Sequence, residues 1–175
     1  QAASLVALAI ELHDERQQKL AINEKYSSFY NYHPDVILEL DLQGYVLNTN
    51  IACREITGFS QEQIQGKQYW TFIPDEYHEL VDAAFKSALL GKSQHYEIPV
   101  YNALEKIIWL DIINLPIIQN QKVTGVFTIA RDISVNRKNK ESLRLLKRGV
   151  DASPSGMFIT DASENMVISF VNPAF

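Results

Sequence analysis

The chain has 175 residues, of which 46% are hydrophobic and 21% are charged, and its net charge at pH 7 is −5. This length and composition are typical of a soluble globular protein with one ordinary domain and some additional length. The acidic balance argues against a nucleic-acid or anionic-membrane partner, because either partner would require a basic face. The single cysteine, Cys53, excludes an internal disulfide framework and fits a reducing cytoplasm.

No apolar run is long enough to cross a bilayer, and the start of the chain has no signal-peptide pattern. We therefore expect a cytoplasmic protein without direct membrane insertion. The chain starts at Gln1 rather than Met and ends inside an apolar pattern, so we expect it to be part of a longer protein.

The first 30 residues or so have a helical pattern. In a seven-residue register, Glu15 and Lys19 interrupt a seam of apolar side chains formed by Leu5, Leu8, Leu12, Ile22, Tyr26 and Phe29. Two compatible interpretations stay open: an amphipathic helix packed on its own domain, and a two-helix coiled coil between subunits. The second predicts a homodimer whose interface contains Leu5, Leu8, Leu12, Ile22 and Phe29.

The next segments predict a hairpin and several helices. VILELD and YVLNTN flank Leu42-Gln43-Gly44, where glycine supplies the positive φ of a tight turn. Ser60, followed three residues later by Gln63, predicts a capping box at a short helix. Residues 75–90 predict a longer helix that ends at Gly91, with one apolar face formed by Leu80, Ala84, Phe85 and Leu89.

Three strands are predicted after this helix, from HYEIPVY, KIIWLDIINLPII and VTGVFTIA. The polar run Gln119-Asn120-Gln121 is expected to join the last two as a hairpin. The middle strand is apolar on both faces, with Asp111 as its one charge. Both faces should therefore be covered, one by the internal helices and the other by the N-terminal helix or a partner.

The last part of the chain predicts a charged helix and then a repeat of the first hairpin. The basic cluster of the helix has no interleaved aromatic residues, so we interpret it as a solvated face rather than a nucleic-acid site; it comprises Arg137, Lys138, Lys140, Arg144, Lys147 and Arg148. SPSGMFITDASENMVISFVN at 153–172 then repeats HPDVILELDLQGYVLNTN at 33–50. The interval from Pro34 to Pro154 equals that from Asp41 to Asp161. The repeat predicts that a unit of domain length starts twice.

Two strands, short helices, a longer helix and three strands within about 110 residues resemble a PAS domain. The resemblance covers residues 26–136 and is carried by HPDVILELDLQGYVLNTN, TGFSQEQIQGK at 57–67, FIPDEYHELVDAAFKSALLG at 72–91, IIWLDIINLPI and VTGVFTIARDIS. ARDIS resembles the closing Asp-Ile-Thr signature of the family, with Ser134 where Thr is usual. The resemblance implies an α+β fold with a five-stranded antiparallel sheet in the order 2-1-5-4-3 and helices on one face.

The resemblance also implies a domain organisation: an N-terminal helix (1–25), a PAS domain (26–133), a linker helix (134–149) and the start of a second, truncated PAS domain (150–175). SLVALAIELHDER at 4–16 is similar to the closing helix of a GAF domain. RGVDASPSGMFITDA followed by FVNPAF is similar to PAS modules that precede GGDEF and EAL domains, which make and break cyclic di-GMP. Such modules also precede histidine kinases. We expect a bacterial signalling protein of the GGDEF/EAL type, with a histidine kinase as the alternative.

No catalytic site is predicted in this stretch, because phosphate loops, Gly-x-Ser-x-Gly elbows and metal-type Cys spacings are all missing from the sequence. The metal-like group Asp75, His78, Glu79 and Asp82 is interpreted as a solvated helix face. His78 does not fall where haem-binding PAS families place their ligand. Flavin photochemistry of the LOV type needs a Cys near residues 69–71, and Cys53 lies too early.

A small pocket is the remaining candidate for binding. Trp70, Phe72, Tyr96 and Trp109 could line it, although plain core is the alternative for these aromatic residues. No cofactor or metal is predicted. A non-covalently bound flavin, a small acid or an aromatic ligand stays open.

Two functions follow from these patterns. In the first, a sensory module sends an input through Asp132, flanked by Arg131 and Ile133, to downstream PAS and effector domains. The Asp132 carboxylate would cap the linker helix and contact its start or a nearby basic residue. In the second, the domain is a ligand-free dimerisation and spacing module.

Overall fold

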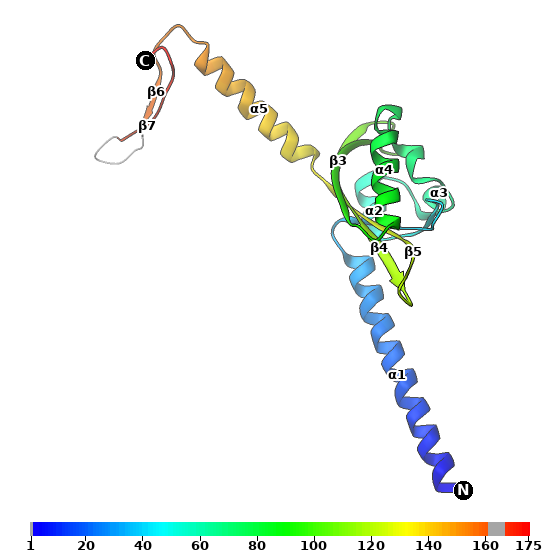
Figure 1. Cartoon of the computed structure of the whole chain (residues 1–175). Helices are drawn as coiled ribbons and strands as arrows, with labels where there is room; N and C mark the ends of the chain where they lie inside the picture. Colours follow the sequence, from blue (N-terminus) through cyan, green and yellow to red (C-terminus); the bar gives the residue numbers. More distant parts are fainter. Residues whose placement is uncertain (1, 161–166) are drawn as a thin grey trace. The chain divides into compact units, whose positions relative to one another are not determined.

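The structure is a computed structural model that describes residues 2–160 and 167–175, with the backbone alone described for residues 2–9 and 11. The chain divides into two compact units, one up to Asp132 and one from Ile133 onward. Each unit is described by itself, because their relative positions are not determined (Figure 1).

The first unit starts with a long helix that leads into a compact domain. Helix α1 continues to Tyr32, beyond the boundary at residue 25 that the pattern indicated. The elements are α1 (Ala2–Tyr32), β1 (Val36–Leu40), β2 (Val46–Thr49), α2 (Ile51–Thr57), α3 (Gln61–Ile64), the 3-10 helices η1 (Tyr69–Phe72) and η2 (Asp75–Tyr77), α4 (His78–Leu89), β3 (Gln94–Tyr101), β4 (Ile107–Gln119) and β5 (Lys122–Asp132).

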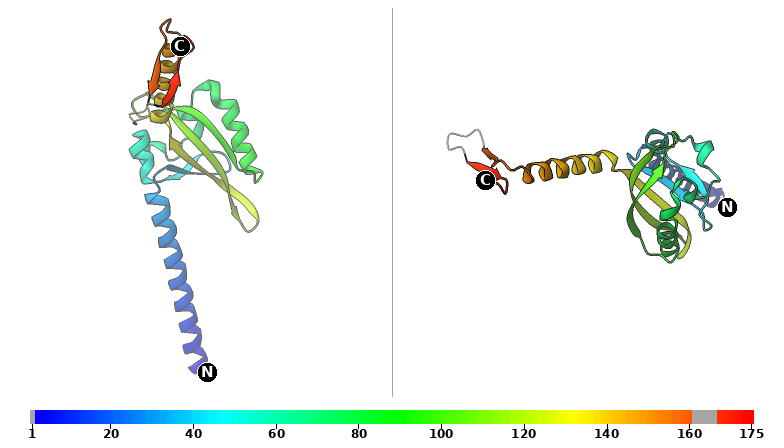
Figure 2. Two further views of the ribbon diagram at one scale, coloured as in Figure 1. Left: turned by 90° about the vertical axis from the view of Figure 1, so that its left-hand side faces the viewer. Right: turned by 90° about the horizontal axis from the view of Figure 1, so that it is seen from above.

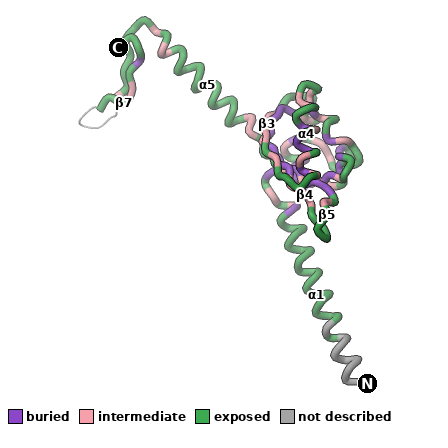
Figure 3. The backbone as a smooth tube through the Cα atoms, viewed as in Figure 1, coloured by how far each residue is buried: buried purple, intermediate pink, exposed green. Residues whose placement is uncertain are grey.

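The five strands form one antiparallel sheet in the order β2-β1-β5-β4-β3, which confirms the predicted fold and strand order. The first hairpin therefore pairs with the last strand, with Val36 opposite Ala130 and Leu40 opposite Val126. Helices α2 and α4 pack against one face of the sheet (Figures 1 and 2). Burial is concentrated between these layers, whereas the described part of α1 is largely exposed (Figure 3).

Two predicted turns are confirmed by their backbone angles. Gly44 has φ +84° in the first hairpin, where the Asp41 carboxylate accepts hydrogen bonds from the backbone N–H groups of Gln43 and Tyr45 at 2.9 and 2.8 Å. The β4–β5 hairpin turns at Asn120 and Gln121, which both have positive φ. Positive φ at both central residues gives the turn a twist that matches that of paired strands.

The buried stripe of α4 shares Ala84 and Phe85 with the predicted apolar face but differs from it at both ends. Val81, Ala84, Phe85 and Ala88 are buried, which is the i, i+3, i+4, i+7 stripe of a helix that packs on a sheet. Leu80 was expected on this face, but it lies off the stripe and is 48% exposed.

The opposite face of the sheet is open at some apolar positions of β4. Ile107 and Ile113 are 55% and 38% exposed, and nothing in the described part of the chain covers them. The expectation that the N-terminal helix covers this face is therefore wrong at these two positions. Coverage by a partner stays a prediction.

The second unit consists of helix α5 (Ser134–Asp151) and an antiparallel hairpin of β6 (Phe158–Thr160) and β7 (Ile168–Val171). The hairpin falls where the sequence repeat predicts it, although Asp161 lies outside the described residues. Among the helices of the described residues, none is both long enough and apolar enough to cross a membrane.

Candidate functional site

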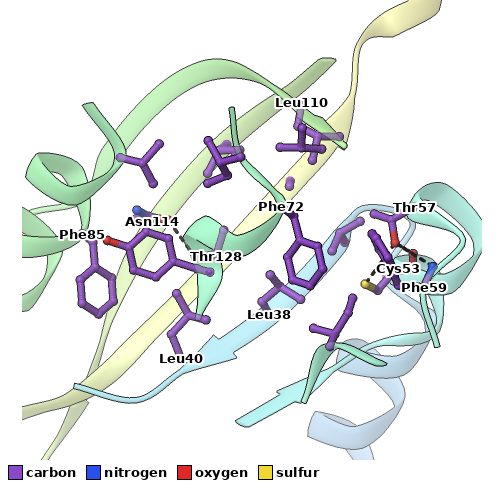
Figure 4. A pocket seen from close by; sticks show the side chains of 18 of the residues that line it. Leu38, Leu40, Cys53, Thr57, Phe59, Phe72, Phe85, Leu110, Asn114 and Thr128 are labelled. Atoms are coloured by element: carbon purple, nitrogen blue, oxygen red, sulfur yellow. Dashed lines mark hydrogen bonds between the residues drawn. The ribbon is translucent and has the colours of Figure 1, made fainter. Parts of the chain in front are cut away.

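A cavity of about 80 Å³ lies between the sheet and the helices of the first unit (Figure 4). Its wall is mostly apolar, with Leu38 and Leu40 from β1, Phe72 from η1, Phe85 from α4 and Leu110 from β4. Every main layer of the domain therefore contributes a side chain to it. A change in the contents of this cavity would reach both the sheet and the helices.

The polar part of the wall is a chain of three side chains from neighbouring strands. The Thr128 hydroxyl donates to Asn114 Oδ1 at 2.9 Å, and Asn114 Nδ2 donates to the Tyr96 hydroxyl oxygen at 3.1 Å. Burial raises the pKa of Tyr96 to about 12, although the hydrogen bond from Asn114 opposes the shift. Tyr96 is therefore neutral at pH 7 and presents a phenol to the cavity.

Cys53 also lines the cavity, and its side chain is buried. Burial raises the pKa of this thiol, while its contact with the Thr57 hydroxyl, 3.7 Å away, acts in the opposite direction. Because the thiolate is the reactive form of cysteine, a protonated thiol here is a poor nucleophile.

Tyr69 is the most unusual residue of the wall. Its ring packs against Phe85, with 4.9 Å between ring centroids, and lies so close to Gly44 that a Cβ there would come within 2.6 Å of it. Within the described part of the chain, its buried hydroxyl has no hydrogen-bond partner. A buried hydroxyl without a partner costs about 1–3 kcal/mol of stability.

The predicted pocket residues are only partly brought together. Phe72 and Tyr96 line the cavity, as expected. Trp70 and Trp109 do not belong to the wall: Trp70 is 38% exposed, and Trp109 packs edge-on against Tyr77. Along β4, side chains alternate between the two faces, so Trp109 lies on the face opposite that of Leu110 and Ile112, which line the cavity.

Sequence reasoning missed Tyr69, Asn114 and Thr128. Asn114 carried a usable signal, since it is an amide inside the apolar run IIWLDIINLPII and is only 2% exposed. A buried amide requires partners, and strand register places Thr128 directly opposite it. No comparable pattern marks Tyr69 in the sequence, because whether its hydroxyl finds a hydrogen-bond partner depends on its three-dimensional surroundings.

In the metal-like group on α4 and η2, His78 Nε2 lies 3.8 Å from Asp75 Oδ1, but members of the group also interact with residues outside it. A ring nitrogen of His78 hydrogen-bonds to the carbonyl of Ile73 at 2.9 Å, and Asp82 forms an ion pair with Lys86 at 2.6 Å. Within residues 2–160 and 167–175, no three His, Cys, Asp or Glu side chains are arranged to hold a metal ion.

The end of β5 is joined to the start of β1 by an ion pair. Arg131 donates to both carboxylate oxygens of Asp35, at 3.1 and 2.9 Å. Asp35 is only 8% exposed and follows the end of α1 by three residues. Such a two-point contact fixes the relative orientation of the two groups as well as their distance.

Asp132 is the last residue of β5, and α5 begins two residues later at Ser134. The N-cap position is occupied by Ile133, which forms no side-chain cap hydrogen bond. Neighbouring Arg131 is engaged with Asp35. Capping of the linker helix by Asp132 therefore stays a prediction.

The predicted dimer seam is exposed wherever its side chains are described. Leu12, Ile22 and Phe29 are 57%, 68% and 63% exposed. The side chains of Leu5 and Leu8 lie outside the described residues. Association through this seam stays a prediction.

The strand order β2-β1-β5-β4-β3, with helices on one face over a small cavity, defines an α+β domain of the PAS type. The sequence model of the PAS domain family matches residues 34–135, and the chain belongs to this family. A second PAS domain model matches residues 141–175. PAS domains are sensory and signalling modules.

Several solved PAS domains share this fold. One from Colwellia psychrerythraea is 26% identical, with a TM-score of 0.60, and the match covers 65% of this chain and 98% of that one. A domain of a sensor histidine kinase/response regulator from Geobacter sulfurreducens is 15% identical (TM-score 0.57; 63% and 93% covered). A PAS domain of a LuxR-family regulator from Burkholderia thailandensis, in complex with ethanol, is 12% identical (TM-score 0.53; 62% and 97% covered). Among curated protein sequences, none matches the chain.

We predict that Tyr69→Phe raises the free energy of unfolding by about 1 kcal/mol, because the orphaned hydroxyl is removed and the ring stays. Asn114→Ala is the matched opposite case: it leaves the hydroxyls of Thr128 and Tyr96 unpaired and should lower stability by about 1–3 kcal/mol. Urea unfolding followed by circular dichroism measures both. A loss of stability in Tyr69→Phe would show that this hydroxyl has a partner.

Proposed function

We propose that this PAS domain is a sensory module that passes an input to a downstream effector through the junction of β5 and α5. The ion pair between Arg131 and Asp35 is the observation that carries the proposal. It connects the segment after the incoming helix with the strand before the outgoing helix. A shift of the sheet therefore changes both helix connections together.

The location of the pair makes it suitable for this role. The Asp35 carboxylate is largely shielded, since its side chain is 12% exposed, whereas the Arg131 side chain is 66% exposed. Loss of the arginine would leave a shielded charge without its counter-ion and would weaken the contact between β1 and β5, although solvent around the exposed arginine limits the cost. The ion pair thus favours one relative position of β1 and β5. The proposed coupling residues at this junction are Arg131, Asp132 and Ile133.

We predict that Arg131→Gln and Asp132→Ala leave the sheet folded but change the output of the full-length parent protein. The loss of a helix cap costs about 0.5–2 kcal/mol, which is small against the stability of a domain. In a marginal two-state element, about 1.4 kcal/mol shifts the equilibrium tenfold. Thermal midpoints and parent output are the two measurements.

Lys138→Gln is the control, because it removes a cation from α5, beyond the junction between β5 and this helix. Output that is unchanged from wild type in both Arg131→Gln and Asp132→Ala would retire the junction as the coupling element, whatever their thermal midpoints.

The cavity limits the input that such a sensor could bind. Of the described residues that form its wall, none is Lys, Arg, His, Asp or Glu, so an ionised ligand would have no counter-charge. Its volume is about half that of an engineered cavity of about 150 Å³ that binds benzene. These properties favour a small neutral molecule with one polar group and disfavour a flavin. The ethanol complex of the Burkholderia thailandensis domain supports this by analogy.

We predict that acetone binds in this cavity and that acetate, which has the same number of heavy atoms but carries a charge, does not. Chemical-shift changes in NMR spectra should be confined to cavity residues such as Tyr96 and Asn114. Xenon tests whether the cavity is an accessible apolar space, and it should bind whether or not acetone or acetate binds. Binding of acetate at least as tight as that of acetone would contradict a neutral ligand.

The downstream partner is proposed from the family resemblance. The second PAS match at residues 141–175 and the repeated hairpin support a tandem array in which residues 150–175 start a further PAS domain. An effector for cyclic di-GMP turnover, of the GGDEF/EAL type, is our first candidate. The Geobacter sulfurreducens neighbour supports the alternative of a histidine kinase.

The second candidate function is a ligand-free dimerisation and spacing module. The exposed seam of α1 and the open positions Ile107 and Ile113 on β4 favour it, because exposed apolar side chains in contiguous sets mark association surfaces. The two functions are compatible, since a sensor that works through paired helices also requires a homodimer.

We predict that the double substitution Leu12→Lys and Phe29→Lys weakens self-association, because a charge buried in the seam would have no partner. Sedimentation velocity measures the effect. The control is the pair Leu90→Lys and Leu104→Lys, two exposed leucines outside the seam. An unchanged dimer in the seam variant would exclude α1 as the interface.

A further inference from the structure

Asn50 and Asn172 occupy equivalent places in the two units. Each directly follows the second strand of a hairpin, and each is almost fully buried, at 4% and 3% exposure. Asn50 follows β2 in the unit that α1 enters. Asn172 follows β7 in the unit that contains α5.

The side chain of Asn50 holds three backbone groups. Its Oδ1 accepts from the N–H of Ile37 at 3.0 Å, and its Nδ2 donates to the carbonyls of Asp35 at 2.9 Å and His33 at 3.3 Å. His33 is the residue directly after α1. One amide thus connects the end of the incoming helix with the first strand of the sheet.

Asn172 makes the same set of bonds in the second unit. Its Oδ1 accepts from the N–H of Met157 at 2.7 Å, and its Nδ2 donates to the carbonyls of Ser155 and Val150, both at 3.0 Å. Val150 belongs to the last turn of α5. The backbone N–H of Asn172 also donates to the Met157 carbonyl, as that of Asn50 does to Ile37.

Side-chain packing alone does not hold the hairpin of the second unit to α5. Phe158, Ile159 and Ile168 of the hairpin are 56%, 59% and 52% exposed, so among the described residues these three side chains pack little against α5. Asn172 is buried nevertheless, because backbone from the helix end and from the hairpin surrounds it. The amide itself is therefore a main connection between α5 and the hairpin.

We propose that Asn50 and Asn172 are clasps, each holding the incoming helix to the first hairpin of the module that follows, so that helix and hairpin turn as one body. Without the clasp, the residues between helix and strand would act as a flexible linker. The relay of signals by these clasps rests on the proposed sensory function, but the clasp itself can be tested separately.

The test measures the distance between α5 and the hairpin with spin labels on Arg144→Cys and Ile168→Cys, both exposed positions, in the whole chain. Cys53 is buried and should not take a label. Asn172→Ala should broaden the distance distribution about twofold, because the helix end is released. Asn139→Ala, an exposed asparagine of α5, is the control and should leave the distribution unchanged.

Asn172→Asp separates the two sides of the clasp. It keeps the acceptor for the Met157 N–H but loses both donors to the carbonyls. The distance distribution should therefore broaden as in Asn172→Ala, while exchange of the Met157 N–H stays slow. In Asn172→Ala this N–H should exchange about tenfold faster. A distribution of wild-type width in either variant would overturn the clasp.

The same test can be made in the first unit, whose hairpin belongs to a domain with a hydrophobic core. Asn50→Asp, with labels on Lys25→Cys and Leu47→Cys, should broaden the distance between α1 and the hairpin while the PAS core stays folded. An unchanged width there would also overturn the proposal. Broadening together with unchanged output of the parent would support the clasp and contradict the proposed relay function instead.

Discussion

The pairing of β1 with β5 is the contact on which the rest of the domain depends. It places the first strand beside the last, so the entry and exit of the chain meet at the centre of the sheet. Gly125 permits this approach, because a Cβ at that position would lie 2.4 Å from the carbonyl oxygen of Leu40. The Arg131–Asp35 contact and the cavity both lie along the same pair of strands.

Much of the fold could be predicted from local patterns. Glycine at residue 44, the polar run before β5 and the apolar runs of the strands each depend on neighbours in sequence, and the structure confirms the turns and strands that they predict. The assignment of Leu80 to the core failed for a physical reason. The buried stripe of α4 runs from Val81 through Ala84 and Phe85 to Ala88, and Leu80 lies one residue before it, about 100° around the helix from Val81.

The site was predicted less well, because its features depend on contacts across the fold. Of the four aromatic residues predicted to line a pocket, Phe72 and Tyr96 belong to the wall, whereas Trp70 and Trp109 do not. The Arg131–Asp35 pair spans 96 residues of sequence, and no spacing rule connects such positions. Family resemblance supplied the topology, whereas the choice of polar partners requires coordinates.

The length of α5 has a consequence for how modules of this kind can be joined. Its 18 residues correspond to about five full turns at 3.6 residues per turn, and each residue turns the direction of the side chains by about 100°. One inserted residue would rotate everything after the helix by about 100°, whereas seven would return it to within about 20°. Linker helices between such domains are therefore expected to vary in length by steps of seven residues. Other steps would rotate the next hairpin about the helix axis.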